Sequence, residues 1–398
     1  MAVMFAILAW IVYVAKTNIT KLLSLPAPSS YVDNTNCHYI QDEDDTIRGA
    51  EDVVAWKNGI VITSSLNFFD YMEHGRGGAG VGGLFAFNIQ EENPRVKRLE
   101  PLGFPGEFNP LTHGLFLSNS SDRLYVVCHW GPRSTVEIFD ISYAPTAAVS
   151  VSLTWFRSVN TAAWPSGGLN DVVEGRTANE LYVSQYLPAP VAEHGRKDTS
   201  FSSVLTRIAT IGKNLLHIKT TGVHRCTFTD NPAVPSDCVL ASETKWVGAN
   251  GLAIDPDRTT LFVVDFVPQT VSKLTINPSS GALELEQTID TPYVCDNIAY
   301  VDETGAVECG AILNMSNVFF NADKPLNEQK PVPGGLLKLI PPTEGSGGEW
   351  KTELELAHDG TLLSQVSAAV HVGNRIVLGT PSAPGILICD PPNDSVNN

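Results

Sequence analysis

Acidic and amide side chains recur along the chain where apolar segments begin, and these side-chain types are suited to binding a hard cation. The residues are Glu51–Asp52, His113, Asn170–Asp171, Asn250 and Asp296–Asn297. Ca²⁺ takes about six to eight oxygen ligands, whereas zinc sites are built mainly from His and Cys. Glu51 and Asp296 would repel each other if buried together, and a divalent ion would neutralise both. The set therefore predicts a calcium site, in which the ion polarises a carbonyl or phosphoryl oxygen for attack by water.

A simpler explanation for these residues is that Asn and Asp often form turns at strand ends. One or two such residues would carry no further meaning. Here five of the segments begin with polar residues in the same register. This repetition favours a shared metal site over independent turns.

The segments that follow the polar residues are copies of one pattern. Six copies begin at Glu51, His113, Asn170, Asn250, Asp296 and Ser367. Each has two stretches of alternating apolar residues across a turn that holds Gly, Asn or Asp, which is typical of a β-hairpin. Six such repeats predict an all-β fold, a six-bladed β-propeller with a central metal tunnel; a β-sandwich is the alternative. In a propeller the innermost strands begin at one end of the tunnel, so the polar residues would converge there.

The composition indicates a folded protein and excludes one class of partner. The chain has 398 residues, of which 43% are hydrophobic and 17% charged, and its net charge is −17. Binding of nucleic acid requires a basic surface, so the acidity excludes nucleic acid as a partner.

The N-terminal segment is apolar and carries no charge before Lys16. As a helix, residues 1–15 would be about 22 Å long, short of the ~30 Å core of a bilayer. We interpret residues 1–24 as a secretory signal that stays attached as an anchor, and residues 25–398 as the propeller; a cleaved signal is the alternative. The propeller would then be secreted or held at a membrane or lipid surface, on the lumenal or extracellular side. Four glycosylation sequons agree with this route, at Asn18, Asn119, Asn314 and Asn393.

Two other segments are predicted to be loops. The glycine-rich stretch Gly75–Gly83 has no helix after it, so it does not bind a dinucleotide, and we expect a flexible loop over the tunnel mouth. Pro188–Ser203 is polar and irregular, which indicates a surface loop. Outside the N-terminus, no segment shows a sustained helical periodicity of about 3.6 residues.

Six motifs resemble those of the paraoxonase/arylesterase family in order and spacing. They are GAEDVV from Gly49, NPLTHG from Asn109, VVCHWGPRSTVEIF from Val126, GLNDVV from Gly168, GANGLAIDPD from Gly248 and VCDNIAYVDETG from Val294. The resemblance runs from Cys37 to Cys389 and implies a six-bladed propeller with two calcium ions in its tunnel. The residues implied to hold the catalytic ion are Glu51, Asn170, Asn250, Asp296 and Asn297. The groups implied to hold the structural ion are Asp52, Asp171 and the backbone carbonyl of Leu115.

His113 and His129 match the histidine pair of this family, so the resemblance implies a catalytic role for both. A neutral imidazole can take a proton from water, and a second histidine can orient the first or relay its proton. Two positions depart from the family pattern: Gly248–Ala249 replace an aromatic residue, and Gly310 stands where a histidine is usual. These positions shape the substrate pocket, so the substrate preference of the family does not carry over directly.

The resemblance implies a calcium-dependent hydrolase of aryl esters and lactones, with organophosphate triesters as a side activity. The chain has no GxSxG motif, which argues against a serine hydrolase. One alternative is a gluconolactonase-type propeller with a single metal ion, and another is a non-catalytic scaffold similar to strictosidine synthase. The paired residues Glu51–Asp52 and Asn170–Asp171 favour two ions, and a scaffold has no need of the ligands together with His113.

Seven cysteines bear on how the ring closes. Cys37 precedes the first repeat and Cys389 follows the sixth, so a propeller brings them onto one blade, and the resemblance implies the same pair. A bond across nearly the whole chain would stabilise the fold by roughly 5–6 kcal/mol in the chain-entropy model. Cys226 and Cys238 are a second candidate pair. The remaining cysteines, which are expected to be buried thiols, are Cys128, Cys295 and Cys309. If the chain were not secreted, all seven would be reduced.

Overall fold

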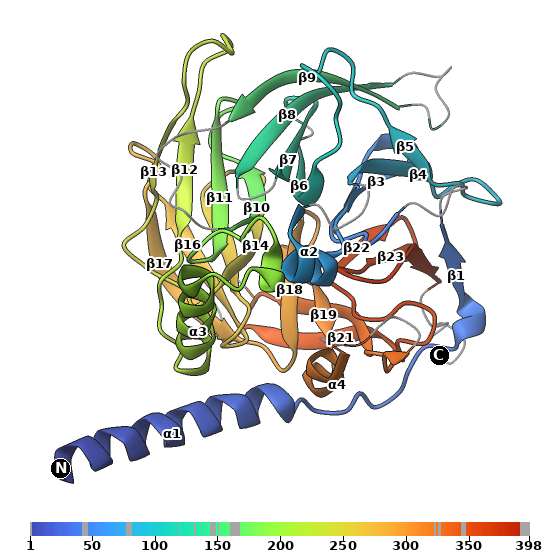
Figure 1. Cartoon of the computed structure of the whole chain (residues 1–398). Coiled ribbons are helices and arrows are strands. Elements are labelled where there is room, and N and C mark those ends of the chain that lie inside the picture. The colour runs from blue at the N-terminus through green and yellow to red at the C-terminus, as the bar shows by residue number, and fades with distance from the viewer. Residues whose placement is uncertain are drawn as a thin grey trace.

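The fold is mostly β, with four α-helices among the residues that the structure describes. The computed structural model describes residues 2–41, 47–76, 82–118, 120–130, 133–143, 149, 151–159, 168–321, 324, 328–343 and 348–390. The strands form six four-stranded antiparallel sheets arranged as blades around a centre (Figure 1). The predicted six-bladed propeller is confirmed, and a sandwich is excluded.

Each blade starts with an inner strand and continues outward along the chain. Blade 1 consists of β2 (Val53–Ala55), β3 (Ile60–Ser65), β4 (Gly83–Asn88) and β5 (Lys97–Leu99). Blade 2 consists of β6 (Leu111–Ser118), β7 (Arg123–His129), β8 (Ser134–Tyr143) and β9 (Val151–Val159). Blade 3 consists of β10 (Gly168–Glu174), β11 (Glu180–Leu187), β12 (Val223–Thr227) and β13 (Asp237–Leu240). Blade 4 consists of β14 (Ala249–Ile254), β15 (Thr260–Asp265), β16 (Thr270–Ile276) and β17 (Leu283–Asp290). Blade 5 consists of β18 (Val294–Val301), β19 (Ala306–Ile312), β20 (Gly334–Ile340) and β21 (Lys351–His358).

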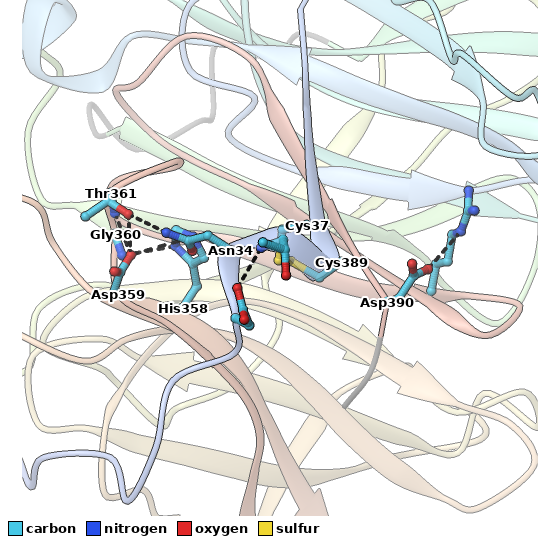
Figure 2. Close-up of a disulfide and its surroundings, with 11 residues drawn as sticks. Asn34, Cys37, His358, Asp359, Gly360, Thr361, Cys389 and Asp390 are labelled. Carbon is cyan, nitrogen blue, oxygen red and sulfur yellow. Dashed lines mark hydrogen bonds and ion pairs between the residues drawn. A yellow bond between two sulfur atoms is a disulfide. The ribbon is translucent and has the colours of Figure 1, made fainter. Parts of the chain in front are cut away.

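Blade 6 combines the two ends of the propeller. It consists of β22 (Ala368–Val372), β23 (Arg375–Gly379), β24 (Ile386–Cys389) and, at its outer edge, β1 (Cys37–Ile40). Cys37 and Cys389 lie directly opposite each other in the ladder and form a disulfide, with their Cα atoms 4.1 Å apart (Figure 2). Near this bond, Nδ2 of Asn34 donates a hydrogen bond to Oγ1 of Thr361 at 2.9 Å. The expected pair therefore closes the ring.

Two more disulfides lie within single blades. Cys226 and Cys238 face each other on β12 and β13 and are bonded, as expected for the second candidate pair. Cys295 and Cys309 are also bonded, so the prediction that they are thiols is wrong. They are offset in the ladder, but a bulge after Cys295 brings their Cα atoms to 5.6 Å. Cys128 is a buried thiol, as expected. Three disulfides suggest a secretory or extracellular protein.

Apolar clusters fill the space between neighbouring blades. Ile62 of blade 1 packs with Val126 of blade 2, and Val127 of blade 2 packs with Leu181 of blade 3. Val126 and Val127 point to opposite faces of β7, so this sheet is buried on both sides. Burial on both sides explains why the second strand of a repeat reads as a nearly continuous apolar run.

The four helices lie outside the blades. They are α1 (Ala2–Leu23), α2 (Phe68–His74), α3 (Phe201–Leu215) and α4 (Met315–Asn321). The N-terminal helix α1 continues past Lys16 to Leu23, and its N-terminal part projects beyond the propeller (Figure 1). Among the described residues, no helix has both the length and the apolar character needed to span a membrane.

The prediction that the rest of the chain lacks helices is wrong. The short 3₁₀-helix η4 (Gly195–Lys197) interrupts the predicted loop Pro188–Ser203, and α3 begins at Phe201. Ser200 caps α3, because its side chain accepts a hydrogen bond from the N–H of Ser203. The sequence does contain the signal, since the apolar residues of α3 recur at spacings of three and four: Phe201, Val204, Leu205, Ile208, Ile211 and Leu215.

Helix α2 precedes the glycine-rich stretch and lies over the centre of the ring (Figure 1). The stretch Gly75–Gly83 follows α2 and leads to β4. Residues 77–81 lie outside the described part of the chain, so a flexible loop there stays a prediction.

Candidate functional site

The polar residues lie at β-bulges in four inner strands. In the β6–β7 ladder, Thr112 pairs with Cys128 and Leu115 with Val126, so the inner strand carries one extra residue. The β10–β11, β14–β15 and β18–β19 ladders shift in the same way. The residues within the four bulges are His113–Gly114, Asn170–Asp171, Asn250–Gly251 and Asp296–Asn297. Bulges change the direction of side chains and are frequent next to functional sites, and here each one falls on the predicted polar position.

Glycines in two of the bulges allow neighbouring blades to approach closely. A Cβ atom on Gly114 would lie 2.4 Å from Oδ1 of Asp171, and one on Gly251 would lie 2.4 Å from the carbonyl oxygen of Asp296. No side chain fits at these distances. The polar residues of adjacent inner strands therefore lie close together.

We call the predicted acids and amides the tunnel column; its members are Glu51, Asp52, Asn170, Asp171, Asn250, Asp296 and Asn297. All seven are buried. Burial raises the pKa of Glu51 to about 8. It also raises the pKa values of Asp52, Asp171 and Asp296 well above the usual range, and their mutual repulsion adds to this. Four carboxylates in this space cannot all be ionised without a cation nearby.

Within the column, four oxygen atoms have no hydrogen-bond donor among the described residues. They are Oε2 of Glu51 and the Oδ1 atoms of Asn170, Asn250 and Asn297. The amide nitrogens are used instead: Nδ2 of Asn297 donates to the carbonyl oxygen of Glu51 at 2.9 Å, and Nδ2 of Asn170 lies 3.2 Å from Nε2 of His113. Buried acceptors without donors are costly unless a ligand completes them. The donor set of carboxylate and amide oxygens fits calcium.

Asp52 and Asp171 are bonded differently from the rest of the column. Asp52 accepts the N–H groups of Val53 at 2.8 Å and Leu115 at 2.7 Å. Asp171 likewise accepts the N–H of Val172 at 2.7 Å and, from blade 4, that of Leu252 at 2.6 Å. Each carboxylate therefore joins its own blade to a neighbour. The backbone group of Leu115 in contact with Asp52 is the N–H, and calcium binding by its carbonyl stays a prediction.

The two predicted histidines are in contact. Nδ1 of His113 lies 2.9 Å from Nε2 of His129, and Nδ1 of His129 lies 2.8 Å from Oγ of Ser134. Nε2 of His113 lies 3.3 Å from Oε1 of Glu51, which links the pair to the column. Burial lowers the pKa of His113 to about 3, so its imidazole is neutral at ordinary pH. A neutral pair in this arrangement can pass a proton along the line from His113 to Ser134.

Aromatic residues that were not predicted cover the histidines. From α2, the ring of Tyr71 stacks on His129 with a centroid distance of 5.3 Å, and Phe68 lies 6.3 Å from His113. From β11, Tyr186 meets His113 edge-on at 5.6 Å. These residues come from separate segments, so no local pattern in the sequence could associate them with the site.

The two glycines that depart from the family pattern have different surroundings. A Cβ atom on Gly248 would lie 3.5 Å from the carbonyl oxygen of Tyr186, an ordinary contact, so a side chain has room to begin there. A Cβ atom on Gly310 would lie 2.3 Å from the carbonyl oxygen of Ser367. Blades 5 and 6 are thus too close for a histidine at position 310.

A second acidic group lies between blades 5 and 6, away from the predicted residues. Glu308, Glu355 and His371 bring ligand atoms within 4.8 Å of one another, a spacing that could hold a metal ion. Nζ of Lys338, however, lies 2.6 Å from Glu355 and 3.8 Å from Glu308. His371 bridges the two acids, with Nδ1 2.6 Å from Glu308 and Nε2 3.0 Å from Glu355. Because the lysine and histidine already neutralise the acids, we call these four residues the ion cluster.

Two of the four predicted glycosylation sites are described. Nδ2 of Asn18 donates to the carbonyl oxygen of Leu215 at 2.8 Å, and Oδ1 of Asn314 accepts the N–H of Asn317 at 3.1 Å. Asn119 and Asn393 lie outside the described residues. Glycosylation stays a prediction at all four positions.

Fold and site together define a six-bladed propeller whose inner strands carry buried acidic and amide side chains beside a histidine pair. No family model matches the chain. It is similar to serum paraoxonase/arylesterase 2 of Bos taurus, with 26% identity over 294 residues, 72% of this chain and 72% of the relative. It is also similar to serum paraoxonase/arylesterase 2 of Rattus norvegicus, with 24% identity over 293 residues, again 72% of each. The predicted resemblance is confirmed as a distant one: the chain is a six-bladed propeller with distant similarity to serum paraoxonase/arylesterase 2.

Two solved structures are also similar to the chain. The periplasmic gluconolactonase of Pseudomonas aeruginosa has a TM-score of 0.49 and 11% identity over 86% of this chain and 89% of that chain. A luciferin-regenerating enzyme has a TM-score of 0.48 and 10% identity over 87% of this chain and 93% of that chain.

Proposed function

We propose that this protein is a calcium-dependent hydrolase of aryl esters and lactones, with organophosphate triesters as a side activity. The main support is the set of four buried oxygen atoms in the tunnel column that lack donors among the described residues. The distant similarity to serum paraoxonase/arylesterase 2 agrees with this proposal. A non-catalytic scaffold has no physical reason to keep such atoms buried, because each of them lowers stability.

The proposal assigns the column two tasks. Glu51, Asn170, Asn250, Asp296 and Asn297 would hold a catalytic calcium ion. Asp52, Asp171 and the Leu115 carbonyl would hold a structural one. When bound, the catalytic ion would supply polarisation of the substrate's carbonyl or phosphoryl oxygen.

The histidine pair would handle the proton released by the attacking water. Neutral His113 can accept a proton at Nε2 while its Nδ1 proton moves to His129, 2.9 Å away. His129 can in turn give its Nδ1 proton to Oγ of Ser134, at 2.8 Å, and the partly exposed Ser134 would release its own hydroxyl proton to solvent. Phe68 and Tyr71 would exclude bulk water from this line, which strengthens electrostatic interactions in the site.

A single-metal lactonase of the gluconolactonase type is the second candidate. One observation favours it: both carboxylate oxygens of Asp52 and of Asp171 already accept backbone N–H groups. These acids could therefore join blades without a second ion. The number of bound ions separates the two candidates.

Counting calcium is the decisive experiment. The purified protein is analysed by atomic spectroscopy and assayed with phenyl acetate and δ-valerolactone, before and after chelation. Two ions per chain support the leading proposal, one supports the single-metal form, and none supports a scaffold. Asp296→Ala should lose calcium and reduce turnover about 100-fold or more. Full activity in excess chelator would contradict calcium catalysis.

We also propose that the propeller is secreted or anchored on the lumenal or extracellular side, with α1 at a membrane or lipid surface. The three disulfides support a secretory route. The side-chain amide of Asn18 in α1 donates a hydrogen bond to the backbone carbonyl of Leu215 in α3, so the two helices are in contact. Exposed apolar side chains lie on both helices: Val12, Tyr13, Ile19, Phe201, Leu205, Ile208 and Ile211. These side chains would enter the lipid surface.

A further inference from the structure

Tyr186 lies near the C-terminal end of β11, with its ring against the candidate site. Its ring centroid is 5.6 Å from that of His113, at an angle of 90°, and 5.9 Å from that of Phe68. The residue as a whole is partly exposed. Its hydroxyl oxygen, in contrast, is buried and has no hydrogen-bond partner among the described residues. The polar end of the side chain therefore points inward.

The tunnel column is within electrostatic range of this hydroxyl. Burial raises the pKa of Tyr186 well above its usual value, and the negative charges of Glu51 and Asp296, where ionised, raise it further. The phenol is therefore protonated at neutral pH. The hydroxyl of Tyr186 can therefore donate one hydrogen bond. A substrate bound next to the column could accept this bond with one of its oxygen atoms.

Other buried tyrosines have partners for their hydroxyl groups. The hydroxyl of Tyr125 donates to Glu174 at 2.6 Å, and that of Tyr182, on the same strand as Tyr186, donates to the carbonyl oxygen of Gly281 at 2.8 Å. Leaving a buried hydroxyl without a partner costs about 1–3 kcal/mol. Because this destabilisation falls at the candidate site, it indicates that the Tyr186 hydroxyl forms its hydrogen bond only when a ligand is bound.

We infer that Tyr186 is a catalytic residue, whose hydroxyl donates a hydrogen bond to the carbonyl or phosphoryl oxygen of the substrate. The inference rests on the proposed hydrolase function. Charge increases on this oxygen as water attacks, so the bond is stronger in the transition state than in the bound substrate. The backbone of Tyr186 also lies beside Gly248, where the aromatic residue of the family is missing: a Cβ atom on Gly248 would lie 3.5 Å from the Tyr186 carbonyl oxygen.

Tyr186→Phe tests the hydroxyl, with Tyr182→Phe as the matched control from the same strand. For Tyr186→Phe we expect kcat on phenyl acetate and δ-valerolactone to fall about 10- to 100-fold, with KM nearly unchanged. Calcium content should stay at the parental value. The Tm should stay the same or rise, because an unpartnered buried group is removed. Tyr182→Phe should lower Tm and leave kcat unchanged.

Ligand binding gives a readout that does not depend on turnover. A cyclic phosphonate imitates the charged oxygen of the transition state, and δ-valerolactam imitates the neutral substrate. By calorimetry with the calcium-loaded protein, Tyr186→Phe should weaken phosphonate binding about tenfold and leave lactam binding unchanged.

The outcomes separate this inference from the function on which it rests. If the parent hydrolyses esters and Tyr186→Phe keeps full kcat and phosphonate affinity, the inference is wrong and the proposed function stands. An equal loss of kcat in Tyr182→Phe would also overturn it, since the effect would then be structural. If the parent binds calcium but hydrolyses neither substrate, the proposed function and the inference both fail.

Discussion

The tunnel column and the ion cluster are both built from acidic side chains at blade interfaces, but they differ in how their charge is neutralised. In the ion cluster, Lys338 and His371 contact Glu308 and Glu355 directly. In the column, the ion-pair partner of Glu51 among the described residues is His113, at 3.3 Å, and no lysine or arginine contacts it. The acids of the ion cluster are thus neutralised by cationic side chains, whereas under the proposed function a calcium ion would neutralise those of the column.

Glu174 is a buried acid in a third place, and it too is neutralised by groups of the protein itself. Burial acts to raise its pKa, but hydrogen bonds from Ser121 and Tyr125 and the charge of Arg258 outweigh burial and hold the pKa below its usual value. The Arg258 guanidinium lies 2.6 Å from Oε1 of Glu174. This site joins blades 2, 3 and 4 without any need for a metal ion.

The largest expected effect comes from replacing a glutamate by glutamine in the tunnel column, and the same replacement in the ion cluster is its control. Glu51→Gln should reduce kcat/KM for phenyl acetate about 1,000-fold, because it removes a negative ligand from the proposed calcium. It should not lower the Tm of the chelated protein, since a buried carboxylate is replaced by a neutral group. The control, Glu355→Gln in the ion cluster, should lower Tm and leave kcat/KM unchanged. Equal losses of activity in both variants would remove the distinction between the two regions.

An intermediate effect is expected at Asp171, a column residue whose hydrogen bonds also join two blades. Asp171→Ala leaves the N–H groups of Val172 and Leu252 without acceptors, so unfolding should become easier by about 3 kcal/mol. Denaturant melts with and without calcium determine which role dominates. A deficit that grows when calcium is added supports a structural ion at Asp171, and a constant deficit supports hydrogen bonding alone. No deficit in either condition would contradict both roles.

The smallest effect is expected from the pH dependence of the ion cluster. Hydrogen bonds to Glu308 and Glu355 raise the pKa of His371 to about 9, above its usual value near 6.5. Its contribution to stability is therefore complete below about pH 6.5 and is lost as the pH rises through about 9. His371→Gln should lower Tm by about 2 °C at pH 6 and by almost nothing at pH 9.5. A Tm difference that is the same at both pH values would show that protonation of His371 does not stabilise the fold.

The repeats and the polar positions could be predicted because they are local. An alternating apolar pattern after Asp52 or Asn170 indicates a hairpin within about fifteen residues, and the inner strands lie where these patterns begin. The Cys295–Cys309 bond could not be predicted, because it depends on a bulge that shifts the register after Cys295. The sequence contains no signal for that shift.

The parts of the site that escaped prediction come from contacts between distant segments. Tyr71 and Tyr186 are more than one hundred residues apart in the chain and meet the two histidines only after blades 2 and 3 have packed. Likewise, whether an oxygen atom of Asn250 has a donor depends on every neighbour in the folded state. The residue types indicated calcium, but the missing donors are a property of the fold.

The Cys37–Cys389 bond constrains the order of events during synthesis. The ribosome makes β1 early and β24 last, 352 residues later, which takes roughly 20–70 s at typical elongation rates. During this time Cys37 has no native partner, while five other cysteines emerge. The bonds Cys226–Cys238 and Cys295–Cys309 span only 12 and 14 residues, so each can form as soon as its own hairpin is made. Early closure of these local bonds removes four competitors and leaves Cys37 available for the last cysteine of the nascent chain.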